Sequence, residues 1–290
     1  MIIIIGAIIV FASVIGGFMM AGGHVGTLIQ VSEFVVICGA ALGSLIIMSP
    51  KQVLVDMVKQ IIGALKGSPY NRSSYEQLFK ALYELFLLGR RNGMIALEEH
   101  VTNPSSSSIF KKYPSFLNNE RAVRLLCDGL RPIIDGKVKP DQLKSLLQTE
   151  IDTMEAEHHK PVSVLTKVGD SMPGFGIVAA VLGIVVTMGS ISGPIEEIGH
   201  HVAAALVGTF LGILISYGFV NPLAVNIEFN GFLELAYYQC ITTSVSGFAS
   251  GMAPVMAVEM ARRGLGEELR PSAEELESML KGINTSENRG

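Results

Sequence analysis

PGFGIVAAVLGIVVTMGSI at Pro173–Ile191 and VAAALVGTFLGILISYGFV at Val202–Val220 are the two apolar runs that decide the fold of this chain. Each run has 19 residues and contains no Lys, Arg, Asp or Glu. At 1.5 Å per residue such a helix is roughly 28 Å long, close to the ~30 Å hydrocarbon core of a bilayer. Because only the residues Ser192–His201 separate the runs, the pair predicts a transmembrane hairpin.

Small and hydroxyl side chains recur along one side of each run. The first stripe comprises Gly176, Ala180, Gly183, Thr187 and Ser190, and the second comprises Ala205, Thr209, Gly212 and Ser216. Such spacing lets helices approach closely in lipid, so helix packing is one interpretation. The other is an ion path, in which the hydroxyls of Thr187 and Thr209 meet something that passes beside the hairpin.

Two further apolar spans open the sequence, Ile2–Ala21 and Phe34–Met48, with Glu33 at the outer edge of the second. All 22 Lys and Arg residues lie between Pro50 and Met172 or after Pro222. Since positive residues favour the cytoplasmic side, four spans place both termini inside. The fold class is therefore all-α: a polytopic membrane protein with four transmembrane helices and a helical cytoplasmic domain.

The composition divides the chain into five segments. Residues 1–49 hold the first two spans and a short periplasmic loop, and residues 50–169 form a cytoplasmic helical domain. Residues 170–222 are the hairpin, residues 223–265 a cytoplasmic helical extension, and residues 266–290 a polar tail with a disordered end. Ser73-x-x-Glu76 has the form of a capping box for the first long cytoplasmic helix.

Opposite charges gather near residue 90. On one continuous helix Arg91 and Glu98 would be about 20° apart and Arg90 and Glu98 about 80° apart. Both signs would then share one face. This face is either an ordinary solvated surface or a docking surface that aligns a charged partner.

Motifs of other function classes are missing from the sequence. No phosphate-binding loop, nucleophile elbow or redox motif appears, so an enzyme is not expected. The three cysteines form no disulfide or metal pattern, and His158-His159 has no third spaced ligand, so no metal and no cofactor are expected. His200 and His201 are expected to be ordinary loop residues, with a pH-sensing role as the alternative.

The four spans also lack an ionisable side chain at membrane depth. A chain that moves protons across lipid normally holds one there. If the hairpin lines an ion path, the carboxylate must come from another protein, and this chain alone should conduct nothing.

With these features, the sequence resembles the MotA family of flagellar stator subunits. The resemblance covers nearly the whole chain. Its most distinctive parts are LGRRNGM at residues 88–94, VGDSMPGFGIVAAV at residues 168–181 and VGTFLGIL at residues 207–214. More distantly the chain looks like the TolQ and ExbB subunits, which usually have three spans.

The resemblance implies a homopentameric ring in the bacterial inner membrane around a dimer of MotB, whose membrane helix carries an essential aspartate. It implies that ion flow drives the ring against the rotor protein FliG, with Arg90, Arg91 and Glu98 as contacts. A proton is the favoured ion and Na⁺ is the alternative. The ion path would include Thr187, Thr209, Ala180 and Ser216, and no nucleic acid is implied.

Pro173 and Pro222 match family prolines that are linked to conformational coupling, and Glu150 matches an acidic position with a role in the family. Each proline also has a structural interpretation: Pro173 would begin a helix and Pro222 would help to end one. A TolQ- or ExbB-like transducing subunit is the alternative function, and an autonomous channel is a third class. The product of the neighbouring gene would discriminate the first two.

Overall fold

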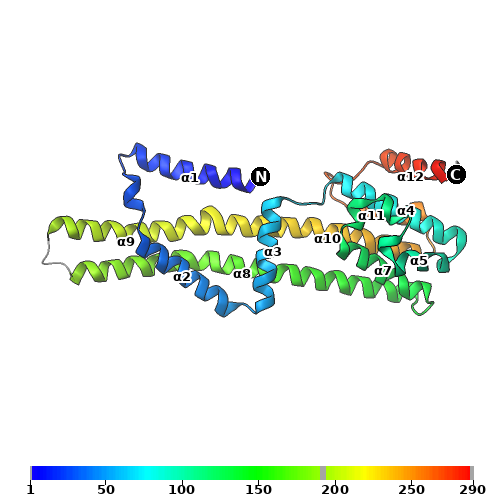
Figure 1. Ribbon diagram of the computed structural model, residues 1–290, viewed down its shortest axis with the longest axis horizontal. Helices are drawn as coiled ribbons and strands as arrows, with labels where there is room; N and C mark the ends of the chain where they lie inside the picture. Colours follow the sequence, from blue (N-terminus) through cyan, green and yellow to red (C-terminus); the bar gives the residue numbers. More distant parts are fainter. Residues whose placement is uncertain (1, 190–193, 288–290) are drawn as a thin grey trace. The chain divides into compact units, whose positions relative to one another are not determined.

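The computed structural model describes residues 2–189 and 194–287, and every regular element in these ranges is helical (Figure 1). The chain divides into two compact units. The first comprises Met1–Gly67 and Glu157–Asn230, and the second comprises Ser68–Ala156 and Gly231–Gly290. Four of the described helices are long and apolar enough to cross a membrane, which confirms the predicted fold class.

The first unit contains the apolar helices. Its elements are α1 (Ile2–Met20), η1 (Val25–Leu28), α2 (Val31–Met48), α3 (Lys51–Lys66), the second part of α8 (Pro140–Gly189), α9 (Ile195–Ile215), the π-helical turn η5 (Ser216–Val220) and the start of α10 (Asn221–Ala249). None of the residues of α1 is buried, as expected for a helix whose surroundings are lipid or other subunits. Amphipathic α3 buries Met57 and Ala64 against α8 and α10, and ends at Gly67 with φ +90°.

Two helices are much longer than the predicted spans. α8 runs without interruption for 50 residues through Pro161 and Pro173, so the prediction that a helix begins at Pro173 is wrong. A proline inside a helix loses its own N–H bond to the carbonyl four residues before it, and packing on both sides of Pro173 keeps the helix continuous. α9 already begins at Ile195, seven residues before the predicted run; Ser190 and residues 191–193 lie outside the described part.

Pro222 does not end a helix either. The chain passes from α9 through η5 directly into α10, with Pro222 in the first turn of α10. A regular helix would press the proline ring against the carbonyl of Gly218, four residues earlier. Gly218 lies within the π-helical turn, whose wider winding relieves this conflict, so the helix adjusts at Pro222 where the sequence suggested a stop.

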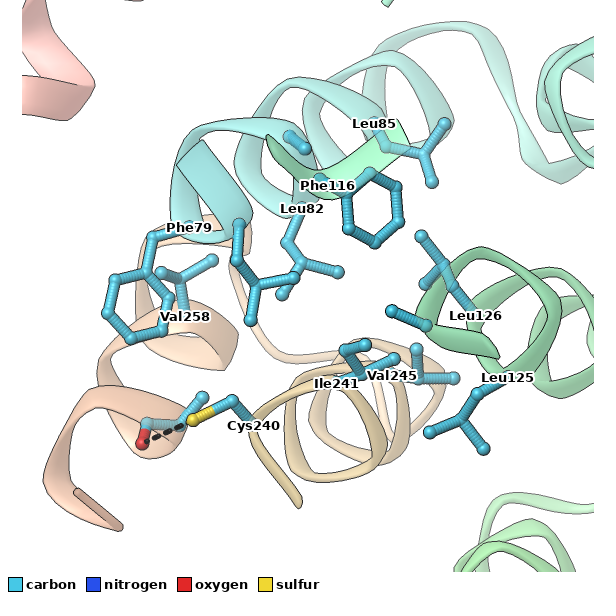
Figure 2. Packing of buried hydrophobic residues seen from close by; sticks show 14 of the residues in the cluster. Phe79, Leu82, Leu85, Phe116, Leu125, Leu126, Cys240, Ile241, Val245 and Val258 are labelled. Carbon is cyan, nitrogen blue, oxygen red and sulfur yellow. Dashed lines mark hydrogen bonds between the residues drawn. The ribbon is translucent and has the colours of Figure 1, made fainter. Parts of the chain in front are cut away.

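The second unit is a helical bundle around one hydrophobic core (Figure 2). Its helices are α4 (Arg72–Asn92), α5 (Glu98–Thr102), α6 (Pro114–Leu117), α7 (Glu120–Ile134), the first part of α8, the rest of α10, α11 (Pro254–Arg263) and α12 (Ala273–Glu287), with short 3₁₀ turns η2 (Met94–Leu97), η3 (Pro104–Ser106) and η4 (Phe110–Lys112). Phe86 of α4 stacks on Phe248 of α10 with ring centroids 4.4 Å apart. In Figure 2 the thiol of Cys240 donates to the carbonyl of Ala261 at 3.6 Å.

The caps of two helices differ from expectation. α4 is capped by Asn71, whose side chain accepts from Ser74 N while Ser74 Oγ accepts from Asn71 N, so the predicted box at Ser73 and Glu76 is wrong. A reciprocal box at Ser272 and Glu275 begins α12. Leu276 and Leu280 of α12 are buried in the core, so much of the predicted polar tail is part of the second unit.

The compact units also divide the chain differently from the predicted segments. α3 belongs to the first unit, whereas the sequence division placed it with residues 50–169. The divisions within α8 and α10 fall after Ala156 and Asn230, where neither helix is interrupted. Composition changes at the ends of apolar runs, but these helices continue beyond them, so composition could not locate the divisions.

Candidate ion path and rotor contact

Small residues hold the hairpin of α8 and α9 together. A Cβ atom on Gly176 would lie 2.8 Å from the carbonyl oxygen of Gly208, and one on Gly212 would lie 2.7 Å from that of Met172. One on Gly183 would lie 3.0 Å from the Cβ of Ala205. Both stripes therefore provide close helix packing, as the packing interpretation predicted.

The predicted hydroxyls lie at different levels of this hairpin. Because Gly176 faces Gly208 and Gly212 while Gly183 faces Ala205, Thr209 is nearly level with Ala180. Thr187 lies about 10 Å farther along α8 than Ala180. Its hydroxyl is buried and donates to Gly183 O at 2.8 Å. The structure therefore does not bring Thr187 and Thr209 together.

Thr209 and Ala180 are half-buried, whereas Ser216 is fully buried. None of the described residues gives Ser216 Oγ a hydrogen bond. Ser216 is the first residue of the π-helical turn η5, where the backbone pattern of a regular helix is broken. Ser216 therefore places a buried hydroxyl without a described hydrogen-bond partner at the turn where the helix winding changes.

The prolines flank a polar contact between α8 and α10. Asn221 Nδ2 donates to Asp170 Oδ1 at 2.9 Å, and the Asn221 side chain also lies directly against Gly169. Asp170 precedes Pro173 by three residues, and Asn221 is the neighbour of Pro222. The two predicted coupling residues therefore lie on either side of this contact, about one helical turn apart along the first unit. Pro173 is half-buried there and Pro222 is exposed.

Glu33 is a residue that sequence reasoning missed. It lies in the first turn of α2, only 5% exposed, and its carboxylate rests against the backbone of Gly208 in α9. None of the described residues gives its Oε2 a hydrogen bond. The statement that the spans lack an ionisable group is therefore corrected, because the packing places this edge residue beside α9. The sequence signal that could have identified Glu33 is a carboxylate directly before an apolar run.

The charged patch is built differently from the prediction. α4 ends at Asn92, Gly93 adopts φ +86°, and Glu98 begins α5, so Arg90 and Glu98 are not on one helix. The helical-face argument is wrong. Tertiary packing nevertheless joins the two helices there: the side chain of Leu97 packs against Gly89, where a Cβ would lie 3.0 Å away. Arg90, Arg91 and Glu98 are all exposed at this corner of the second unit.

Glu150 lies on α8 within the second unit and is half-buried. Its burial, and next the charge of Asp128, raise the pKa of its carboxyl, while Arg121 opposes the shift. A carboxylate held near another acid is destabilised in its charged form.

Comparisons with known proteins place this hairpin in a family. The model described as "Motility protein A N-terminal" matches residues 4–93, and the MotA/TolQ/ExbB proton channel family matches residues 118–227. Motility protein A of Salmonella typhimurium is 38% identical over 283 residues, covering 98% of this chain and 96% of the relative. The chain belongs to the MotA family.

Other relatives agree with membership of the MotA family. Chemotaxis protein LafT of Vibrio parahaemolyticus is 34% identical over 276 residues, covering 95% of this chain and 97% of the relative. The C. jejuni MotAB structure has a TM-score of 0.77 at 20% identity and covers 93% of this chain and 98% of that one. The structure of the flagellar MotAB stator complex from Bacillus subtilis has a TM-score of 0.73 at 22% identity. The match covers 95% of this chain and 98% of that one. At these identities the structures support the MotA fold.

The relatives confirm the predicted function in motility, and the TolQ- or ExbB-like alternative is not favoured. Four candidate spans agree with this assignment, because three spans were expected for those transport subunits. The first unit therefore combines the tightly packed hairpin of α8 and α9, two prolines about one helical turn apart, and a carboxylate of α2 that is buried against Gly208.

Proposed function

We propose that this chain is a stator subunit of the bacterial flagellar motor. Five copies surround a dimer of a MotB-like partner in the inner membrane, with both chain termini in the cytoplasm. Proton flow between the hairpins and the partner's membrane aspartate drives the ring, which turns the rotor through FliG. No catalytic chemistry is assigned to this chain.

The observation that carries this proposal is the hairpin of α8 and α9, closed through Gly176, Gly183 and Gly212. Such contacts let the two long helices move together, while Pro173 and Pro222 weaken the backbone of each helix at positions about one helical turn apart. An ion crossing 100 mV releases about 2.3 kcal/mol, so a coupling element must hold arrangements that differ by a few kcal/mol. A locally weakened helix pair satisfies this requirement.

Two features support the partners and the orientation. The exposed charges Arg90 and Glu98 belong to the second unit, as a cytoplasmic rotor contact requires. The Lys and Arg residues are confined to the segments expected inside. A proton is the favoured ion because the described residues contain no cluster of three acidic, histidine or cysteine side chains that could hold a metal ion, whereas metal cations are held by several ligands. Sodium remains the alternative.

A stator-deleted strain tests the proposal. This chain expressed together with its MotB-like partner should restore swimming, and either protein alone should not. Swimming should persist when sodium is removed and stop when a protonophore is added. Recovery by this chain without a partner would contradict the shared channel, and sodium-dependent swimming would replace the proton by Na⁺.

A further inference from the structure

We propose that Glu33 is a proton-binding site in the membrane part of this chain, reached from a polar cavity at the outer end of α9. The inference rests on the proposed function and adds a second titratable group to the ion path, one that belongs to this chain. Its evidence lies in the burial of Glu33, the absence of a side chain at Gly208, and the lining of the cavity.

The carboxylate is far from the end of α9, although its residue opens α2. Gly208, against which it rests, lies roughly 20 Å along α9 from Ile195. α2 therefore begins beside the middle of α9, as the ribbon of the first unit shows (Figure 1). Thr209, the next residue, is the half-buried hydroxyl predicted for the ion path.

Gly208 makes the space that the carboxylate occupies. Any Cβ at this position would overlap Glu33 Oε2, and it would also come within 3.2 Å of the Ala179 side chain of α8. The adjoining cluster is apolar, with Ile37, Ala179, Val207 and Leu211. An ionised carboxylate with an unpaired oxygen in such surroundings is strongly unfavourable, and uptake of a proton removes the cost.

A cavity of about 550 Å³ lies at the outer side of this carboxylate, lined by Gln30, Ser32, Glu196, His200, His201 and Ala204. Ser32 is the chain neighbour of Glu33. Ala204 lies on α9 one turn before Gly208, about 6 Å along the helix. The cavity therefore ends within one helical turn of the carboxylate, and water in it can exchange protons with Glu33.

The titratable groups around Glu33 favour proton supply from the cavity. α9 contributes the carboxyl side chain of Glu196 and the imidazole side chains of His200 and His201 to the cavity. α2 contributes Glu33 itself. The α8 residues described as packing against this part of α9, Ala179 and Gly183, are uncharged. A proton entering from the cavity binds a Glu33 oxygen as O–H and leaves to the partner's membrane carboxylate.

The occupant is a proton because the site offers one carboxylate. A metal cation in a protein is held by several oxygen ligands, and the described residues contain no cluster of three acidic, histidine or cysteine side chains suited to a metal. One unpaired oxygen is sufficient for a proton.

The test uses the full complex with its partner, made leaky by removing the partner's channel plug. Proton flux is followed as the fall of internal pH in cells, in wild type, Glu33→Gln, Glu33→Asp and the control Asp56→Asn. The control makes the same change from carboxylate to amide on α3, where Asp56 pairs with Lys59 at 3.5 Å. Membrane levels and recovery of the partner on purification are measured in parallel.

We expect Glu33→Gln to assemble with the partner and to reduce proton flux about tenfold or more, as when a positioned proton carrier is lost. Glu33→Asp should retain part of the flux, and the control should match wild type. Wild-type flux in Glu33→Gln would overturn the inference and leave Glu33 as a packing residue. If wild type itself conducts nothing, the proposed function fails instead.

A second measurement applies if Glu33→Gln does not accumulate. Infrared difference spectra of the purified wild-type and Glu33→Asp complexes should each show a protonated carboxylic acid that titrates with pH, at different band positions. Identical bands in the two complexes would show that the titrating group is not Glu33.

Discussion

Glycine at position 176 is a residue whose missing side chain has a direct structural consequence. The helices α8 and α9 approach so closely there that a methyl group would press on the carbonyl of Gly208. Gly174, two residues earlier on the same helix, faces open space and is exposed. Substituting alanine at each of the two glycines therefore distinguishes the effect of close helix packing from the effect of helix propensity.

We expect Gly176→Ala to destabilise the hairpin by about 1–3 kcal/mol through overpacking, and to lower both membrane accumulation and swimming. Gly174→Ala should keep both at the wild-type level, because alanine is the better helix former in an open position. Immunoblots of membranes and swimming speed provide the readout. Equal behaviour of the two variants would argue against close packing at Gly176.

Glu259 is a second residue with a measurable effect. It lies on α11, accepts from Arg262 Nε at 2.7 Å and from Arg263 Nε at 2.8 Å, and its side chain is 15% exposed. Arg262 in turn donates to the carbonyl of Pro271 at 2.8 Å, next to the cap of α12. The Arg262 hydrogen bonds lower the pKa of Glu259 from 4.5 to about 2.

A lowered folded-state pKa stabilises the protein above the unfolded-state pKa and loses this effect as pH falls through the folded value. Glu259→Gln should therefore cost about 3 kcal/mol at neutral pH, and the difference from wild type should shrink between about pH 4.5 and pH 2. Thermal unfolding of the detergent-solubilised chain at several pH values measures this difference in stability. Glu267→Gln, an exposed change on the neighbouring loop, is the control. A difference that persists unchanged at low pH would contradict the ion-pair explanation.

At the scale of the element, α8 and the α9–η5–α10 helix explain how a proline can weaken a helix without ending it. Pro173 removes one backbone bond from α8, and Pro222 follows a π-helical turn. The hydrogen bond between Asn221 and Asp170 joins the two helices beside both prolines. A change in this contact can therefore be transmitted to both helices at once.

Pro173→Ala restores the missing backbone bond and should stiffen α8. We expect this variant to assemble with the partner and to retain much of the proton leak of an unplugged complex, while losing torque. Leak is read from internal pH and torque from the rotation of tethered cells. If leak and torque fall equally, Pro173 merely shapes the channel and has no coupling role.

At the scale of the whole molecule, the proposed rotor contact depends on the second unit and not on a single helix. Gly93 follows the end of α4, and Leu97 packs back on Gly89, so the fold of α4, η2 and α5 brings the residues that directly precede Arg90 and Glu98 into contact. Buried residues of α4, α7, α10 and α11 hold this corner in place.

Each of the charge reversals Arg90→Glu and Glu98→Arg should impair torque while leaving membrane insertion and ring assembly intact. Because both side chains are exposed, their loss should change stability by less than about 1 kcal/mol. A compensating reversal on the rotor protein should restore part of the swimming speed, as expected for charges that align partners. Normal swimming of the double reversal in an unmodified strain would show that the patch is only a solvated surface.

The sequence by itself determined the four apolar helices, the hairpin and the helical second unit, because these follow from hydrophobic length and periodicity within short stretches of chain. It also indicated the close packing of Gly176 and Gly212, as one of two interpretations of small residues at helical spacing. Only the tertiary structure decided where Glu33 lies, because the offset between α2 and α9 depends on contacts between residues far apart in sequence. It likewise decided that α8 continues through Pro173 and that a break at Gly93 places Arg90 and Glu98 on different helices: packing on both sides outweighs one lost backbone bond, and a glycine with positive φ redirects the chain.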